Sequence, residues 1–130
     1  MCTILFAYDC HPRYKLVAAA NRDEFYQRPT ASAAFWSDNP NILAGRDLKE
    51  GGTWMGITNN GRFAGLTNYR DPSSFRPEAK SRGHLVTNYL NTNLAPETYA
   101  ANLVDGGSTY NGFNLLMATN ESMYYYSNRE

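Results

Sequence analysis

The dipeptide Asn60-Gly61 constrains the fold of this chain more strongly than any other local feature of the sequence. It lies between two apolar runs, TWMGI at residues 53–57 and RFAGLTNY at residues 62–69. Asn-Gly tolerates the positive φ angles of a type I′ turn, whose twist matches that of two paired strands. The sequence therefore predicts an antiparallel hairpin with a type I′ turn. Gly51-Gly52, just before it, allows another backbone to approach closely.

Two further hairpins are expected, one toward each end of the chain. Near the amino end, CTILFAY at residues 2–8 and KLVAAANR at residues 15–22 flank DCHPRY, whose Asp and Pro favour a turn. The continuous apolar character of these runs predicts strands that are covered on both faces. Near the carboxyl end, FNLLMAT and MYYYSN flank NES. The loop-rich segment 24–50 contains AAFW, where a short strand is expected.

Two helices are expected between the second and third hairpins. Residues 79–90 form the first, and the second begins near Pro96, because Pro and the following Glu suit a first turn. Gly106-Gly107 is expected to end the second helix. The apolar faces are Leu85, Val86, Tyr89 and Leu90 in the first helix, and Tyr99, Ala100, Leu103 and Val104 in the second. Strands, helices and strands in this order predict one α+β domain with mainly antiparallel pairing, because a doubly wound parallel sheet would alternate the two.

The composition excludes several classes of function. The chain has 12 Lys plus Arg and 12 Asp plus Glu, so its formal net charge is zero, and basic runs are absent. We therefore expect no nucleic-acid partner and no attraction to anionic membranes. No apolar run reaches the roughly 18 residues of a membrane span, and the start does not resemble a secretory signal. The expected compartment is the cytoplasm, where two cysteines are more typical of free thiols than of a disulfide.

Cys2 has chemistry available to it that an internal cysteine lacks. If Met1 is removed, the thiol and the free α-amino group of Cys2 belong to one residue. The amine titrates near pH ~8 and a thiol near ~8.5, so the amine can take the thiol proton close to neutral pH. This is the pairing of nucleophile and terminal amine that some hydrolases use, and it needs no histidine.

The run NRDE, residues 21–24, ends the strand that is expected to pair with the strand of Cys2. Counting outward from the turn brings this run opposite the chain start. Arg22 would favour the thiolate there, and the Asp23 carboxylate would hold the ammonium group. A plain structural interpretation stays open, in which Cys2 is a small core hydrophobe and NRDE a solvated strand end.

Six segments, namely MCTILFAY, NRDE, AGRD…GGTWMGI, GRFAGLTNYRDP, SRG and YNGFNLL, resemble the NRDE-motif family, also called the transport and Golgi organisation protein 2 family. The resemblance covers essentially the whole chain. It implies an N-terminal-nucleophile (Ntn) hydrolase fold, an αββα sandwich of two antiparallel sheets between helical layers. Members are about twice this length, so residues 1–130 would be a single domain, the N-terminal half of a typical member, and the sandwich would be incomplete.

The chain start is also similar to the cholylglycine hydrolase and penicillin V acylase group, in which the Cys after Met is the nucleophile for amide hydrolysis. Cys2 matches directly. Asp23 fits the Asp of their Arg-x-x-Asp pattern, but Ala20 stands where their Arg lies, and Arg22 would have to replace it by another route. These acylases carry a further Asn and Arg in their later half.

The Gly-Leu-Asn strand of the same acylases is similar to residues 65–68, with one residue inserted. This similarity makes Asn68 the expected oxyanion donor and Thr67 its rival. Besides the catalytic candidates Cys2, Arg22, Asp23 and Asn68, the residues expected in the binding site are Asn21, Glu24, Trp54, Thr67 and Tyr69, and Trp36 is a further aromatic candidate.

Two functions are therefore expected. The first is an Ntn cysteine amidohydrolase that acts on non-peptide C–N amide bonds of a small molecule, with no cofactor and no metal. The alternative is a carrier that holds an apolar ligand or haem, as implied for members linked to haem trafficking. Cys10, His11 and His84 are possible iron ligands, although the chain lacks Cys-x-x-Cys-His and any known zinc spacing. A thiol redox role for Cys2 or Cys10 ranks last, and the oligomeric state is left open.

Overall fold

The computed structural model describes residues 2–104, 106 and 109–129. The described strands form two sheets, a two-stranded β1-β2 sheet and a six-stranded sheet in the order β3-β4-β5-β6-β7-β8, and their pairings are antiparallel. The strands are β1 Thr3–Tyr8, β2 Leu16–Asn21, β3 Thr30–Phe35, β4 Ile42–Asp47, β5 Met55–Thr58, β6 Phe63–Asn68, β7 Phe113–Ala118 and β8 Met123–Ser127. The helices are η1 Pro72–Ser74, α1 Gly83–Leu90 and α2 Pro96–Leu103. The expected α+β class and antiparallel pairing are confirmed.

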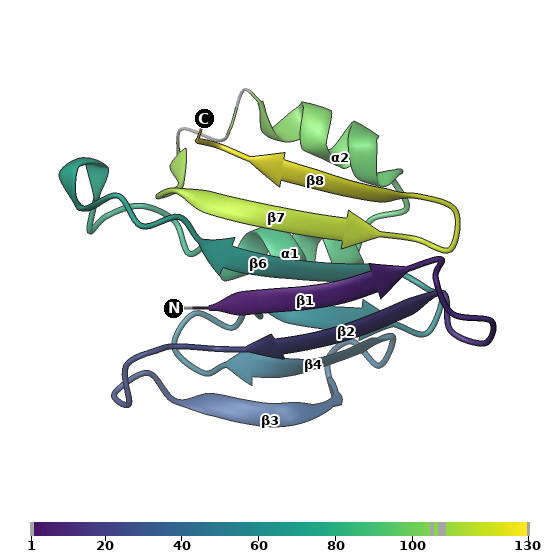
Figure 1. Cartoon of the computed structure of the whole chain (residues 1–130). Coiled ribbons are helices and arrows are strands. Elements are labelled where there is room, and N and C mark those ends of the chain that lie inside the picture. Colours follow the sequence, from purple (N-terminus) through teal and green to yellow (C-terminus); the bar gives the residue numbers. More distant parts are fainter. Residues whose placement is uncertain (1, 105, 107–108, 130) are drawn as a thin grey trace.

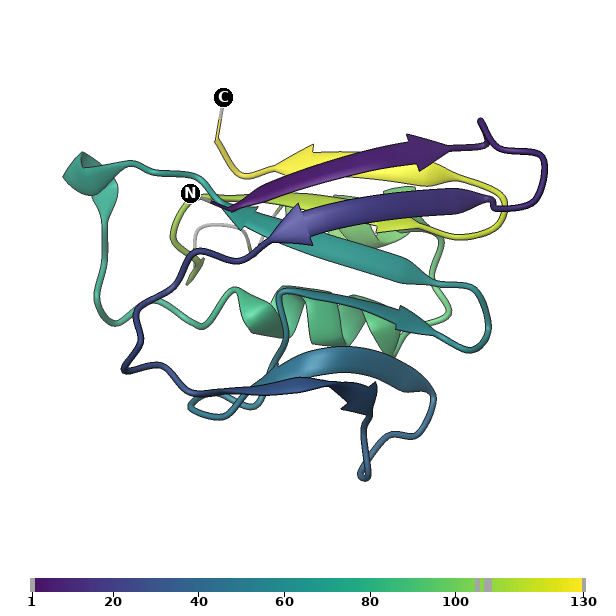
Figure 2. The same cartoon turned by 60° about the horizontal axis from the view of Figure 1, so that its bottom comes forward.

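The six-stranded sheet lies between the β1–β2 hairpin on one face and helices α1 and α2 on the other (Figures 1 and 2). On the helix side, the largest fully buried side chains include Tyr89 of α1 and Phe113 of β7. On the hairpin side, a smaller cluster of Phe63, Leu116 and Ala118 packs against Ile4 and other hairpin residues. The apolar face of each layer is thus buried against the central sheet, which is what stabilises a layered domain.

The first hairpin has the expected register, in which Thr3 pairs with Asn21 and Tyr8 with Leu16. The expectation that both of its faces are covered is wrong for the described chain. Leu5 is 68% exposed and Val17 is 47% exposed. The reason is that successive strand side chains point to opposite faces, and only one face of this hairpin meets the six-stranded sheet.

The Asn60-Gly61 hairpin is confirmed as β5–β6, but its turn is not of type I′. Gly61 has a φ of 84°, whereas Asn60 is not among the described residues with positive φ. The Gly61 N–H donates to Thr58 O at 3.1 Å, and the Thr58 N–H donates to Arg62 O at 2.9 Å. This is the three-residue loop with a left-handed glycine. The Arg62 N–H also donates to Thr58 Oγ1 at 3.0 Å, and this contact favours the longer loop.

The first helix begins at Gly83 rather than at residue 79. Residues before it run beside the chain near Tyr110, with a parallel bridge between Lys80 and Tyr110. Gly52 then comes so close to Gly83 that a Cβ on Gly52 would lie 2.9 Å from the Gly83 carbonyl carbon. The expected close approach is therefore confirmed at Gly52, and the expected apolar stripe of α1 is buried.

The second helix begins at Pro96 as expected and ends at Leu103. Tyr99 and Ala100 are buried, but Val104 is 66% exposed, so its assignment to the apolar face was wrong. Val104 is the C-cap residue of this helix, and its side chain faces solvent. Gly107 of the expected stop signal lies outside the described residues. The final hairpin, β7–β8, and the strand at AAFW, which belongs to the longer β3, are confirmed.

Candidate functional site

Cys2 lies where three cavities meet at the start of the β1–β2 hairpin. The cavities have volumes of about 200, 470 and 250 Å³, and the half-buried Cys2 lines all of them. We refer to them as the first, second and third cavity in that order. A thiol in this position is reachable from solvent and also bordered by protein groups, which a core cysteine is not.

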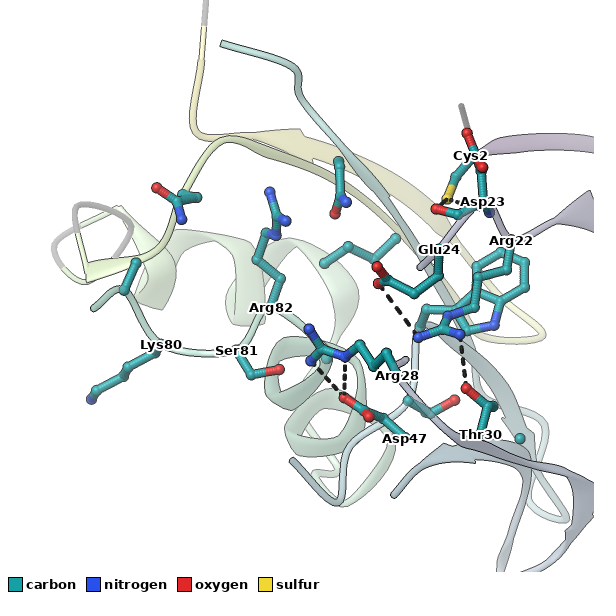
Figure 3. Close-up of a pocket in the computed structure, with 18 of the residues that line it drawn as sticks. Cys2, Arg22, Asp23, Glu24, Arg28, Thr30, Asp47, Lys80, Ser81 and Arg82 are labelled. Atoms are coloured by element: carbon teal, nitrogen blue, oxygen red, sulfur yellow. Dashed lines mark hydrogen bonds and ion pairs between the residues drawn. The ribbon is translucent and has the colours of Figure 1, made fainter. Parts of the chain in front are cut away.

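The hairpin register brings the NRDE run to the sulfur, as expected. Thr3 pairs with Asn21, and Asn21 Oδ1 accepts a hydrogen bond from the Thr3 N–H at 3.1 Å. Beyond the strand, the Asp23 N–H donates to Cys2 Sγ at 3.3 Å, and the thiol in turn lies 3.8 Å from Asp23 O (Figure 3). The contacts of Asp23 to the sulfur thus come from its backbone.

The Arg22 side chain contacts Thr30 and Glu24. Its guanidinium donates to Thr30 Oγ1 at 2.7 Å and pairs with Glu24 Oε2 at 3.5 Å (Figure 3). These contacts connect the NRDE run to the beginning of β3. Arg22, Glu24 and Thr30 all line the first cavity, so these contacts hold part of its wall together.

A second ion pair, between Arg28 and Asp47, lines the first cavity. Arg28 donates to Asp47 Oδ2 from Nη2 at 2.6 Å and from Nε at 3.0 Å. Burial raises the pKa of Asp47, but the hydrogen bonds from Arg28 and from the Lys49 N–H outweigh it, so the net pKa lies below the usual value. The loop after β2 is therefore attached to the end of β4.

The Asp47–Arg28 pair predicts a pH-dependent stability. Because the pKa of Asp47 is lowered in the folded state, its ionisation stabilises the fold fully above the unfolded value of about 3.9. That contribution is lost as the pH falls through the lower folded pKa. Urea unfolding of wild type and of Asp47→Asn should differ at pH 6, and the difference should vanish as the pH falls through the lowered folded pKa of Asp47. A difference that stays constant over this range would contradict the assignment.

Arg82 is a half-buried cation between the first and second cavities, and sequence reasoning missed it. It precedes α1, and its Nη1 donates to Gly112 O at 2.9 Å. Burial lowers the pKa of Arg82, while the charges of Glu24 and Cys2 raise it and that of Arg28 lowers it. Arginine stays protonated despite such a shift. Figure 3 shows the side chain extending from the start of α1 toward the side of the cavity where Cys2 and Asp23 lie.

The remaining expected site residues fall into three groups. Asp23 and Asn68 line the first and second cavities, Trp54 and Glu24 the first, Tyr69 the second, and Thr67 the third. Asn21 lines none of the three. Trp36 is a core residue, 6% exposed, whose Nε1–H donates to Ala44 O at 3.2 Å.

Other residues that line the cavities with Cys2 were not expected from the sequence. The second cavity includes Phe75 and Asn111, and the third includes Asn114 and Tyr125. The irregular segment before α1 and the start of β7 carry no motif with a chemical meaning of its own. Their placement beside Cys2 depends on pairing between strands far apart in the sequence.

The possible iron ligands of the sequence do not come together in the described residues. Cys10 donates to Tyr8 O at the hairpin tip, whereas His84 Nε2 is 2.8 Å from Glu50 O beside α1. Within the described ranges, no three His, Cys, Asp or Glu side chains are grouped closely enough to hold a metal ion. None of the described helices has the length and hydropathy required to span a bilayer.

Comparisons with known proteins agree on one family. The family model described as Transport and Golgi organisation 2 matches residues 1–130. The chain is 44% identical over 141 residues to the Transport and Golgi organization protein 2 homolog of Homo sapiens, which covers 99% of this chain and 51% of that relative. It is 36% identical over 129 residues to Transport and Golgi organization protein 2 of Drosophila melanogaster, and the match covers 89% of this chain and 45% of that relative. The chain thus spans about half the length of these relatives.

Proposed function

The chain belongs to the Transport and Golgi organisation 2 family, and we propose that it is an amidohydrolase in which Cys2 is the nucleophile. The observation that carries the proposal is the place of Cys2 Sγ, half-buried at the junction of three cavities with the Asp23 N–H 3.3 Å away. The substrate class is a non-peptide C–N amide of a small molecule. Substrate and activity are proposals for a chain that spans about half of its relatives' length.

In the first step, with Met1 removed, the α-amino group of Cys2 takes the thiol proton. The sulfur then attacks the amide carbon, and the carbonyl electron pair moves to oxygen. Asn68 and a backbone N–H stabilise this oxyanion. When the oxygen pair returns, the C–N bond breaks, and the α-ammonium gives its proton to the leaving amine. A thioester on Cys2 remains.

In the second step, water attacks the thioester carbon while the α-amino group takes a proton from it. The C–S bond breaks, the acid leaves, and the proton returns the sulfur to its thiol form. The Asp23 carboxylate is proposed to orient the α-amino group between the two steps, since it belongs to the residue whose backbone contacts the sulfur. Deprotonation of the amine near pH ~8 sets the pH at which this exchange becomes efficient.

The layers of the described chain support an αββα sandwich of the Ntn-hydrolase type. The helices, the six-stranded sheet and the β1–β2 hairpin correspond to three of its four layers. Residues 1–130 would then be one domain, the N-terminal half of a typical member. The second helical layer would come from the part of the relatives that this chain does not span. The exposed face of Leu5 and Val17 is where that part would pack.

A carrier of an apolar ligand, haem included, is the second candidate. It is favoured by the second cavity, the largest of the three at about 470 Å³, whose wall contains Phe25, Tyr69, Pro72 and Phe75. A haem titration distinguishes the candidates. A Soret shift that Cys2→Ala leaves intact, in a chain that is not acylated, supports the carrier. A cytoplasmic location stays a prediction for both.

The amidohydrolase is tested with p-nitrophenyl hexanoate, an activated acyl donor. The expected result is a stoichiometric burst of p-nitrophenolate followed by turnover, with the transient hexanoyl group found on Cys2 by peptide mapping. A free terminal cysteine would instead keep the acyl group, because its own amine captures the thioester as a stable amide. No burst, or a permanent amide at Cys2, would contradict the proposal.

A further inference from the structure

Three side chains form a hydrogen-bonded chain across strands β6, β7 and β8. The Tyr125 hydroxyl donates to Asn114 Oδ1 at 2.8 Å, and Asn114 Nδ2 donates to Thr67 Oγ1 at 3.2 Å. The register supports this arrangement, because Thr67 and Asn114 are direct partners and Tyr125 pairs with Leu116, two residues along β7. We call these residues the Asn114 chain.

The Asn114 chain lies on the face of the sheet that meets the β1–β2 hairpin. Side chains alternate along a strand, so Thr67 shares a face with Gly65, where a Cβ would come within 2.8 Å of Ile4 Cδ1. Asn114 likewise shares a face with Leu116, which belongs to the cluster beneath the hairpin. That face is otherwise apolar there; Thr67 and Asn114 are half-buried in it, and Tyr125 is 62% exposed at its edge.

The same alignment puts Cys2 beside the Asn114 chain. β1 and β6 run in opposite directions (Figure 1), and Ile4 lies against Gly65. Two residues back along β1 is Cys2, and two residues forward along β6 is Thr67. The third cavity confirms this neighbourhood, because Cys2, Thr67, Asn114 and Tyr125 all line it.

Two hydrogen bonds hold the side-chain amide of Asn114 in one orientation and leave one of its N–H groups available. Its oxygen accepts from Tyr125, and one of its two N–H groups donates to Thr67. An asparagine amide has two N–H donors, and among the described residues the second has no partner. The half-buried Asn114 also lines the second cavity, together with Cys2 and Asn68.

We propose that Asn114 is a second oxyanion donor of the Cys2 site, with Tyr125 and Thr67 as its positioning residues. This inference rests on the proposed acyl-transfer function. Asn68 lies two residues after the core residue Leu66 on β6, so both side chains are on the helix side of the sheet. Asn68 is therefore on the opposite face of the sheet from Asn114. The two amides therefore approach the second cavity from two sides, and the oxygen of the tetrahedral intermediate lies between them.

The test compares two reactions of the same sulfur in the chain from which Met1 has been removed. Acylation by p-nitrophenyl hexanoate builds negative charge on a carbonyl oxygen, whereas alkylation by iodoacetamide displaces iodide without an oxyanion. Asn114→Ala should slow acylation of Cys2 by about 10²- to 10³-fold, the usual effect of one lost donor. Alkylation of Cys2 should stay within about twofold, because the sulfur and its N–H partner are unchanged.

Tyr125→Phe provides a second variant that keeps the ring in place. It should slow acylation by about two- to tenfold through one lost hydrogen bond, again without slowing alkylation. The matched control is Tyr124→Phe, since the Tyr124 side chain points to the other face of β8 and should leave both rates unchanged.

Each outcome decides a different claim. If wild type is not acylated, the proposed function is wrong, and this inference, which rests on it, is wrong as well. If wild type is acylated and Asn114→Ala and Tyr125→Phe match it, only the role of Asn114 is overturned. If acylation and alkylation fall together, Asn114 supports the structure of the site and is no oxyanion donor. If Asn114→Ala does not fold, Tyr125→Phe decides alone.

Discussion

Cys2→Ala should abolish the burst of p-nitrophenolate and slow acylation by about 10⁴-fold or more, because it removes the nucleophile. Cys2→Ser should keep only a small part of the acylation rate, because a hydroxyl is a much weaker acid than a thiol and gives its proton to the α-amine far less readily. Stopped-flow absorbance at the p-nitrophenolate band measures both effects. Neither substitution should lower the unfolding free energy by more than about 1 kcal/mol, since Cys2 is only half-buried.

The matched control for this prediction is Cys10→Ala. Cys10 is exposed at the tip of the first hairpin, where its thiol donates to Tyr8 O. Its removal should leave the burst amplitude and rate unchanged. A burst that survives in Cys2→Ala and disappears in Cys10→Ala would assign the acylated thiol to the hairpin tip and contradict the account.

Phe113→Ala should lower the free energy of unfolding by about 3–5 kcal/mol, the largest effect on stability expected for any substitution considered. Phe113 is fully buried at the start of β7. Its ring lies edge-on to Tyr110, at 6.1 Å between centroids, and tilted against Tyr126 at 5.8 Å. Removing the ring leaves a cavity in the core that joins β7 and β8 to the helix layer. Urea unfolding followed by tryptophan fluorescence measures the change.

The control for Phe113→Ala is Leu5→Ala on the open face of the first hairpin. Leu5 is 68% exposed, so its truncation should change the free energy of unfolding by less than about 0.5 kcal/mol. Equal losses for the two variants would contradict the assignment of the core. A larger loss for Leu5→Ala would show that the open face is covered in solution.

The approach of the NRDE run to Cys2 was predictable because it depends on local geometry alone. The two strands of a hairpin have the same rise per residue, so residues at equal distances from the turn along the sequence lie opposite each other. The register of Thr3 with Asn21 confirms the count. The count could not assign the contact of Asp23 to its backbone N–H, since the alternation of side chains ends where the strand ends.

Arg82 and Asn114 could not be found in this way. Each reaches the site through pairings between distant segments: Arg82 bonds to Gly112, and Asn114 pairs with Thr67 across β6 and β7. No local pattern encodes such pairings. The prediction that both faces of β1 and β2 are covered was wrong for a related reason. An apolar run indicates that a strand face favours burial, but it does not indicate which segment of the protein packs on that face.

The central claim is that the sulfur and the α-amino group of Cys2 act as a pair. It is tested by comparing the acylation rates of two forms of the chain, one beginning at Cys2 and one that retains Met1 because the aminopeptidase was inhibited during expression, each verified by intact mass. The account predicts that retention of Met1 slows acylation by about 10²- to 10⁴-fold, the usual contribution of a positioned base. Equal rates in the two forms would contradict it.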